Sequence, residues 1–273
     1  ETFIEIAEGI EQDPDTYNMK VKEGMKDGLR YPDACNQALQ FILNKEVRTP
    51  NDLLGLSYVK EVVHNQYPIS MHCIKRTNDY HAKNIERISS ATSLRIALKQ
   101  GIDVSHQLPG YNTYKDSHFF TLEEFYLYLK YLITFTPLEG LHMIEEGLDD
   151  RLYKVNQETY SLEELINSLT SKRYTRSRIQ RMLVHILLHN TKEEMKKAMD
   201  IDYIHILGLS TKGQRYIKTA KKNTEYKIIT NITKHKHPAL DIEKRGAQLL
   251  DLVNPGFFKE TIKAIPYRKI DLK

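Results

Sequence analysis

Apolar residues recur at helical spacing along most of this 273-residue chain. One apolar stripe predicts a helix over 35–42, and a second predicts a helix over 53–63. Pro50 and Asn51 are expected to open this second helix, because proline suits a first turn and asparagine is a favoured N-cap. Other helices are predicted near the N-terminus, from Ser90–Thr92 onward, and over 121–135, 161–170 and 176–190, with Ser161 and Glu164 as a capping box. The chain is therefore predicted to be predominantly helical.

The periodicity changes at residues 69–74, where Ile69, Met71 and Cys73 alternate with their neighbours. This alternation predicts a short strand that ends near Arg76, and together with the helix after Ser90 it makes one α/β unit. Ligands of such sheets lie beyond the carboxyl ends of the strands, which is where Arg76 falls. Two further short strands are predicted at 203–207 and 226–229, and residues 101–117 are expected to be a connector.

The charges divide unevenly along the sequence. Residues 1–170 carry a net charge of −9, and residues 171–273 carry +13. This asymmetry favours a C-terminal region that binds a polyanion such as nucleic acid, with a solvated basic surface as the alternative. No apolar run is long enough to span a membrane, so no membrane partner is expected. Cys35 and Cys73 are too few for a disulfide framework, which indicates core residues of a cytoplasmic protein.

Two segments carry candidate residues for binding a nucleotide. The hydroxyl groups of Ser90, Thr92 and Ser93 fall at a predicted helix N-terminus with Arg95 one turn later, a pattern that fits a phosphate site or an ordinary cap. Asn51 is a candidate for contact with a base or ribose, or is simply a cap. Gly55, inside the same helix, indicates close packing or a ligand.

Basic residues crowd the start of the helix predicted over 176–190. They are Lys172, Arg173, Arg176, Arg178 and Arg181. Cations at a helix N-terminus oppose the helix dipole, and a phosphate backbone lying across them would make the arrangement favourable. The pattern therefore favours contact with RNA or DNA over a passive surface. His235 and His237 have no metal-ligand partner at suitable spacing, so an exposed loop and no metal site are predicted.

Five segments together resemble one family, the bacterial tRNA(Met) cytidine acetate ligases. They occur in the family's order and run almost from end to end of the chain. These segments are Thr49–Val59, Ile74–His81, Ser90–Arg95, Tyr174–Leu183 and Ile206–Gly213.

The resemblance implies a fold and two domains. Residues 1–108 would be the C-terminal part of a Rossmann-like α/β nucleotidyltransferase domain. Residues 109–273 would be a mainly helical, basic region that binds tRNA. The implied activity is ATP-dependent formation of acetyl-adenylate, followed by acetylation of the wobble cytidine of elongator tRNA(Met) to N4-acetylcytidine.

The resemblance also assigns residues. Asn51 and Arg76 match ATP-binding positions, and Ser90, Thr92, Ser93 and Arg95 match a signature near the phosphates. The basic stretch from Lys172 to Arg181 would hold the tRNA backbone, and Mg²⁺ would accompany the ATP. The family's histidine-bearing nucleotide loop is expected before Glu1, because no His-x-x-His or His-x-Gly-His occurs here. The chain is thus expected to be N-terminally truncated, to hold no catalytic residue, and to be inactive alone.

Two other readings remain open on the sequence. One is an RNA-binding module without catalysis, for which the basic C-terminal region suffices. The other is a nucleotidyltransferase that acts on a small metabolite, in which the basic region is incidental.

Overall fold

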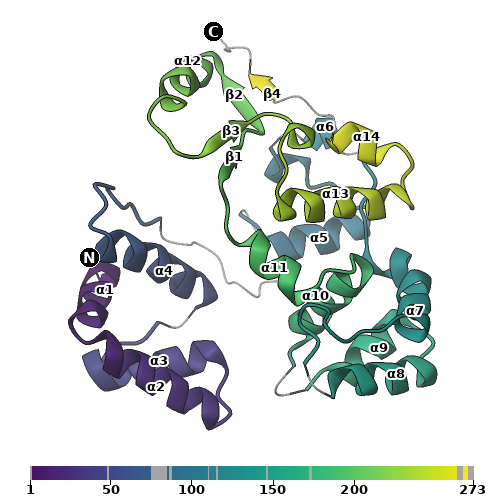
Figure 1. Cartoon of the computed structure of the whole chain (residues 1–273), viewed down its shortest axis with the longest axis horizontal. Helices are drawn as coiled ribbons and strands as arrows, with labels where there is room; N and C mark the ends of the chain where they lie inside the picture. The colour runs from purple at the N-terminus through teal and green to yellow at the C-terminus, as the bar shows by residue number, and fades with distance from the viewer. Residues whose placement is uncertain are drawn as a thin grey trace. The chain divides into compact units, whose positions relative to one another are not determined.

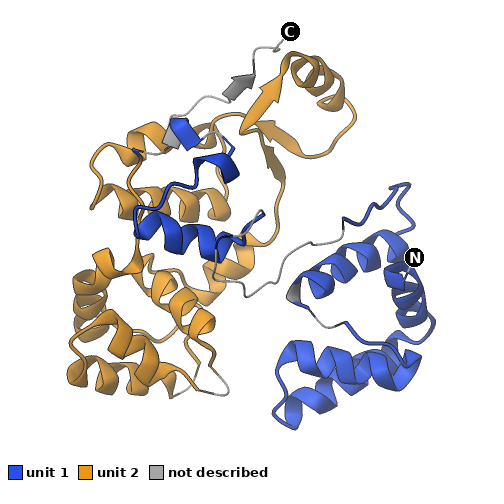
Figure 2. Cartoon of the chain, turned by 180° about the vertical axis from the view of Figure 1, so that it is seen from behind, with its two compact units in different colours: residues 1–116 blue, residues 117–273 orange. Residues whose placement is uncertain are grey.

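The computed structural model describes residues 2–47, 49–74, 85, 88–109, 111–114, 116–145, 147–171, 174–262 and 267–269. The chain divides into two compact units (Figure 2). Unit 1 spans residues 1–116 and unit 2 spans residues 117–273. The described residues are predominantly helical, as the sequence predicts.

Unit 1 begins with four helices (Figure 1). They are α1 (Thr2–Gln12), α2 (Pro14–Lys26), α3 (Tyr31–Leu43) and α4 (Pro50–His64). Helix α2 packs on α3, and α1 packs on α4. The core between them contains Ile6, Ile10 and Leu39 together with Ala7 and Ala38, all almost fully buried. Small alanines at the helix crossings let the backbones approach closely while the larger side chains fill the remaining space.

Local chemistry sets where these helices begin. The Asp13 carboxylate caps α2 by accepting a hydrogen bond from the Thr16 N–H at 3.1 Å, and Pro14 follows it. Thr49 caps α4 in the same way, with its hydroxyl 3.1 Å from the Asp52 N–H. The prediction that Asn51 is the cap is therefore wrong, because proline takes the first helical position and leaves the cap to the residue before it.

The strand predicted over 69–74 is absent. The described residues 67–74 follow an irregular course, although Met71 packs against the core of α1–α4. A strand needs a hydrogen-bonded partner, and no strand is present among the described residues of unit 1. The unit continues with α5 (Ala91–Lys99), the 3₁₀ turn η1 (Ser105–Gln107) and α6 (Tyr111–Tyr114).

Unit 2 opens with a helical group around a large apolar core. Its members are η2 (Leu122–Phe125), α7 (Tyr126–Phe135), α8 (Leu148–Glu158), α9 (Leu162–Leu169) and α10 (Arg176–Leu187). Leu129, Ile133, Leu152, Leu165 and Ile179 are all fully buried in this core. The predicted cap at Ser161 is confirmed, since its hydroxyl accepts a hydrogen bond from the Glu164 N–H at 3.2 Å, but the Glu164 carboxylate accepts from the Tyr160 N–H at 2.9 Å and does not close the capping box on Ser161. Thr175 caps α10.

The rest of unit 2 combines helices with two small parallel sheets. The elements are α11 (Lys192–Ala198), β1 (Tyr203–His205), β2 (Gly208–Ser210), α12 (Thr211–Ala220), β3 (Lys227–Ile229), η3 (Ile232–Lys234), α13 (Pro238–Asp251), α14 (Phe257–Ile262) and β4 (Tyr267–Lys269). Strand β1 pairs with β3, and β2 pairs with β4. The strands predicted at 203–207 and 226–229 are confirmed in shortened form.

Two predictions about individual side chains are wrong. His235 and His237 are both 8% exposed, not on an exposed loop. The Nε2 atom of His235 lies 2.8 Å from Asp202 Oδ1, and that of His237 lies 2.7 Å from the Asp200 carbonyl oxygen. Cys35 is buried as predicted, whereas Cys73 is exposed. The rings of His235 and His237 each bond to a residue more than 30 positions away in the chain, and the local sequence does not reveal such a partner.

Candidate functional site

A mainly apolar pocket of about 700 Å³ lies within unit 1. Its walls are the start of α1, one face of α4 and the irregular segment 67–73. The largest side chains in the lining are Phe3, Tyr58, Tyr67, Ile69 and Met71. Polar side chains complete the lining, namely Thr2, Glu61, Ser70 and His72. A pocket of this size, with a mainly apolar and partly aromatic wall, fits a planar heterocycle better than a strongly hydrated ion.

Gly55 explains how α1 and α4 form one side of this pocket. A Cβ atom at Gly55 would lie 3.1 Å from Cε2 of Phe3, so the aromatic ring occupies the space of the missing side chain. The glycine costs about 1 kcal/mol of helix propensity relative to alanine. Close packing is therefore the reason for a glycine inside this helix.

Asn51 lies on the face of α4 that lines the pocket. Residues 51, 55, 58 and 62 follow helical spacing, and the last three line the pocket. Asn51 is exposed, and its side-chain amide makes no hydrogen bond with any residue that the structure describes. Because Thr49 caps the helix, the amide of Asn51 is available to a ligand one turn from the pocket wall.

Arg76, the second predicted ATP-binding residue, lies outside the described residues. It is two positions after Ile74, in the chain segment that continues from the pocket wall. The sequence predicts Asn51 and Arg76 as ATP-binding residues but gives no indication of the aromatic lining. The seven-residue spacing from Asn51 to Tyr58, two helical turns, is the signal that links that lining to Asn51.

The start of α5 is an ordinary and complete helix cap. The Ser93 N–H donates to the Ser90 hydroxyl at 3.1 Å, and the Ser93 hydroxyl donates to the Ser90 carbonyl oxygen at 2.9 Å. Both serines are at most 3% exposed, whereas Thr92 and Arg95 are exposed. A phosphate here would meet Thr92 and Arg95 rather than the serine hydroxyls. None of these four residues lines the pocket beside α4.

The arginines at the start of α10 have carboxylate partners. Arg176 forms a two-pronged ion pair with Glu163, at 2.9 and 2.5 Å, and also donates to Asn167. The hydrogen bond that Glu163 accepts from Arg176 is the main cause that lowers the pKa of Glu163 below its usual range. Arg178 is paired with Glu145 and lies over the ring of Tyr174.

The structure describes only one of the remaining members of this basic stretch. Arg181 donates to the Ser177 carbonyl oxygen at 3.4 Å, and Lys172 and Arg173 lie outside the described residues. The sequence pattern predicts that the cations at this helix start have no carboxylate partners. The structure instead neutralises Arg176 and Arg178 with protein carboxylates.

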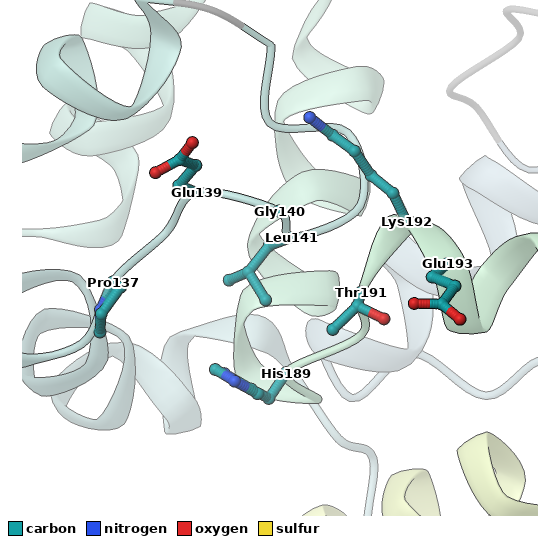
Figure 3. A pocket seen from close by; sticks show the side chains of 8 residues that line it. All are labelled: Pro137, Glu139, Gly140, Leu141, His189, Thr191, Lys192 and Glu193. Carbon is teal, nitrogen blue, oxygen red and sulfur yellow. The ribbon is translucent and has the colours of Figure 1, made fainter.

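A second pocket, of about 470 Å³, lies in unit 2 (Figure 3). Its lining comes from the loop 137–141 and from the junction 189–193 between α10 and α11. The Lys192 N–H donates to the Gly140 carbonyl oxygen at 2.9 Å and fastens the two segments together. Two carboxylates, Glu139 and Glu193, accompany one ammonium group, so this pocket does not suit a polyphosphate.

Two further properties bear on the site. Within the described ranges, no group of three or more His, Cys, Asp or Glu side chains is placed to hold a metal ion. A helix with the length and apolar character of a membrane span is likewise absent from the part of the chain that the structure describes.

Comparison with known proteins identifies relatives over nearly the whole chain. Residues 1–263 match the family model described as HIGH Nucleotidyl Transferase. A tRNA(Met) cytidine acetate ligase of Bacillus subtilis is 32% identical over 92% of this chain and 66% of its own length. The enzyme of the same name from Bacillus cereus strain ATCC 14579 is 34% identical over 90% of this chain and 69% of its own length. The chain thus spans just under two thirds of the Bacillus subtilis relative.

Two solved structures share the fold. The structure of apo Thermotoga maritima TmcAL matches with a TM-score of 0.78 at 21% identity, over 98% of this chain and 74% of that one. The same protein bound with alpha-thio ATP matches with a TM-score of 0.76, also at 21% identity, over 98% of this chain and 73% of that one.

Proposed function

The chain belongs to the HIGH nucleotidyl transferase family and, within it, to the tRNA(Met) cytidine acetate ligases, and on this premise we propose its activity. The proposed enzyme joins acetate to ATP and acetylates the wobble cytidine of elongator tRNA(Met) in the cytoplasm. An acetate oxygen attacks the α-phosphorus, and pyrophosphate leaves to give acetyl-adenylate. The exocyclic amine of cytidine then attacks the acetyl carbonyl carbon, AMP leaves, and the amine loses a proton.

Unit 1 contributes to the nucleotide site in this proposal. The apolar pocket beside α4 receives the adenine ring between aromatic side chains, and the amide of Asn51 bonds the base or ribose. Arg76 adds charge near the phosphates, and Thr92 and Arg95 are the members of the α5 segment best exposed for the same role. This assignment gives residues 1–108 to the catalytic domain and residues 109–273 to the binding of tRNA.

The chemistry requires positioning and neutralisation of charge more than covalent participation by the protein. Both are obtained when arginine side chains and helix N-terminal N–H groups surround the α-phosphate as negative charge develops on it. Because the described residues form no metal-binding cluster, Mg²⁺ is expected to arrive bound to the ATP phosphates.

The observation that carries the proposal is the family membership together with the pocket that lies beside the exposed, unbonded Asn51. Binding of transcribed elongator and initiator tRNA(Met) to the 273-residue chain tests it, over a series of salt concentrations. We expect affinity that falls steeply with salt and a preference for the elongator tRNA. Equal binding of both tRNAs would favour an RNA-binding module without catalysis. Little binding at physiological salt would favour a small-metabolite nucleotidyltransferase.

A second measurement tests the nucleotide site alone. Asn51→Ala is expected to weaken the binding of Mg-ATP, measured by equilibrium dialysis, by about tenfold, the equivalent of one lost hydrogen bond. Asn18→Ala, at an exposed position on α2, is the matched control and is expected to leave the affinity unchanged. Equal affinities for the two variants would remove Asn51 from the site.

A further inference from the structure

The outer face of helix α12 carries three cations and no carboxylate. Gly213, Ile217 and Ala220 form its half-buried inner stripe, and a Cβ at Gly213 would touch Leu209 of β2 at 3.5 Å. The outer residues are all exposed. The charged ones are Lys212, Arg215 and Lys218, and Lys221 and Lys222 follow the helix directly. The uncharged ones are Thr211, Gln214, Tyr216 and Thr219. No Asp or Glu occurs between residues 203 and 224.

These cations differ from those at the start of α10 in having no partner among the residues that the structure describes. None of the five forms an ion pair or side-chain hydrogen bond with any residue in the described part of the chain. Arg176 and Arg178 of α10, by contrast, are both bound to carboxylates. Five like charges within eleven residues repel one another, and Lys212 also opposes the helix dipole. A bound polyanion removes both costs.

From this surface we infer that α12 and the two lysines after it bind the phosphate backbone of RNA. The inference rests on the proposed function and gives the tRNA a docking surface separate from the arginines of α10. Tyr216 is 71% exposed on the same face and offers a ring on which an unpaired base can stack. An anionic membrane fits less well, because an interfacial helix needs an outward apolar face and the apolar stripe of α12 faces β2.

The experiment removes three charges and measures the salt dependence of tRNA binding. The test variant is Lys212→Gln, Arg215→Gln, Lys218→Gln in the full 273-residue chain. The control variant, Lys22→Gln, Lys26→Gln, Lys99→Gln, removes three exposed lysines of unit 1. Binding of transcribed elongator tRNA(Met) is measured by filter retention between about 0.05 and 0.2 M NaCl, where phosphate contacts dominate the salt dependence.

We expect the slope of log affinity against log salt to fall by about two to three for the α12 variant, and the affinity at 0.1 M NaCl by at least about tenfold. Initiator tRNA(Met) is expected to lose the same factor, because backbone contacts carry no sequence information. Tyr216→Ala is expected to weaken binding by about fivefold or more with an unchanged slope, because stacking releases no counterions. The control variant is expected to keep the wild-type slope.

The outcomes separate this inference from the proposed function. Wild-type binding with an unchanged slope in the α12 variant, or an equal decrease in the control variant, overturns the inference alone. An absence of tRNA binding by the wild type overturns the proposed function and the inference with it. Loss of binding to vesicles of phosphatidylcholine and phosphatidylglycerol, with tRNA binding unchanged, would assign α12 to a membrane and overturn the inference.

Discussion

Arg245 of α13 fastens the C-terminal helices of unit 2 to α11, and its removal should be measurable. Its two terminal nitrogens donate to the two carboxylate oxygens of Glu194 at 2.8 and 2.6 Å. One of them also donates to the side-chain oxygen of Asn190 at 2.8 Å. Glu194 lies in the first turn of α11, which Thr191 caps. The carboxylate of Glu194 thus serves a tertiary contact instead of completing a capping box.

The partial burial of the pair fixes the expected magnitude. The Arg245 and Glu194 side chains are 33% and 24% exposed. An exposed ion pair contributes roughly 0–1 kcal/mol, and removing one partner of a fully buried pair costs about 3–5 kcal/mol. Because the geometry is two-pronged and the burial intermediate, Arg245→Met is expected to lower the free energy of unfolding by about 2 kcal/mol. Arg245→Lys keeps the charge but not the fork, so about half of that loss is expected.

Urea unfolding followed by far-UV circular dichroism measures these losses as changes in the free energy of unfolding. Arg215→Met is the matched control, because Arg215 is exposed and unpaired within the described residues, and it should change stability by less than about 0.5 kcal/mol. A double-mutant cycle with Glu194→Gln should give a coupling of about 1–2 kcal/mol. If Arg245→Met is as stable as the control, the contact does not hold α13 to α11 and the reasoning is refuted.

Three other predictions concern pH, packing and a cap. Burial, and then the neighbouring His142, hold the pKa of His185 below its usual range, so this ring stabilises the fold above pH about 6.5 and ceases to do so as the pH falls. His185→Gln should therefore lose less free energy of unfolding than the wild type between about pH 7.5 and 5, and equal losses would contradict the assignment. Gly55→Val should cost about 1–3 kcal/mol in urea unfolding because it drives a branched side chain into Phe3, a cost that Phe3→Ala in the same chain should reduce. Ser90→Ala should cost about 1 kcal/mol and speed amide exchange in the first turn of α5, and unchanged exchange would show that the cap is dispensable.

Helix starts could be predicted because a cap acts within three residues of itself. The predictions at Ser90 and Ser161 are confirmed for this reason. The strand at 69–74 could not be settled in the same way. Alternation of apolar residues reports on exposure, whereas a strand also needs a partner whose position depends on the whole chain. The exposed Cys73 is the visible consequence, since the alternation alone would have buried it.

The candidate nucleotide site could be predicted only in part from the sequence, for a related reason. Asn51 stands out by residue type, but the pocket beside it exists because Phe3, 48 positions earlier, lies over Gly55. Residues that meet through tertiary packing have no local signature, so the aromatic lining had to come from the structure.

Counting charge by segment points to residues 171–273, but it singles out arginines that the folded chain pairs with carboxylates. A boundary drawn at residue 170 separates Arg176 from Glu163 and Arg178 from Glu145, so two neutralised ion pairs contribute to the apparent +13. The quantity that attracts a polyanion is the charge left unpaired after folding, because a paired arginine must first give up its carboxylate. By that measure, the run without Asp or Glu from residue 203 to 224 indicates polyanion binding more strongly than the net charge of residues 171–273 does. It is readable in the sequence, since Lys212 and Arg215 have no carboxylate within nine residues on either side and so have fewer ways to be neutralised by their own helix or turn.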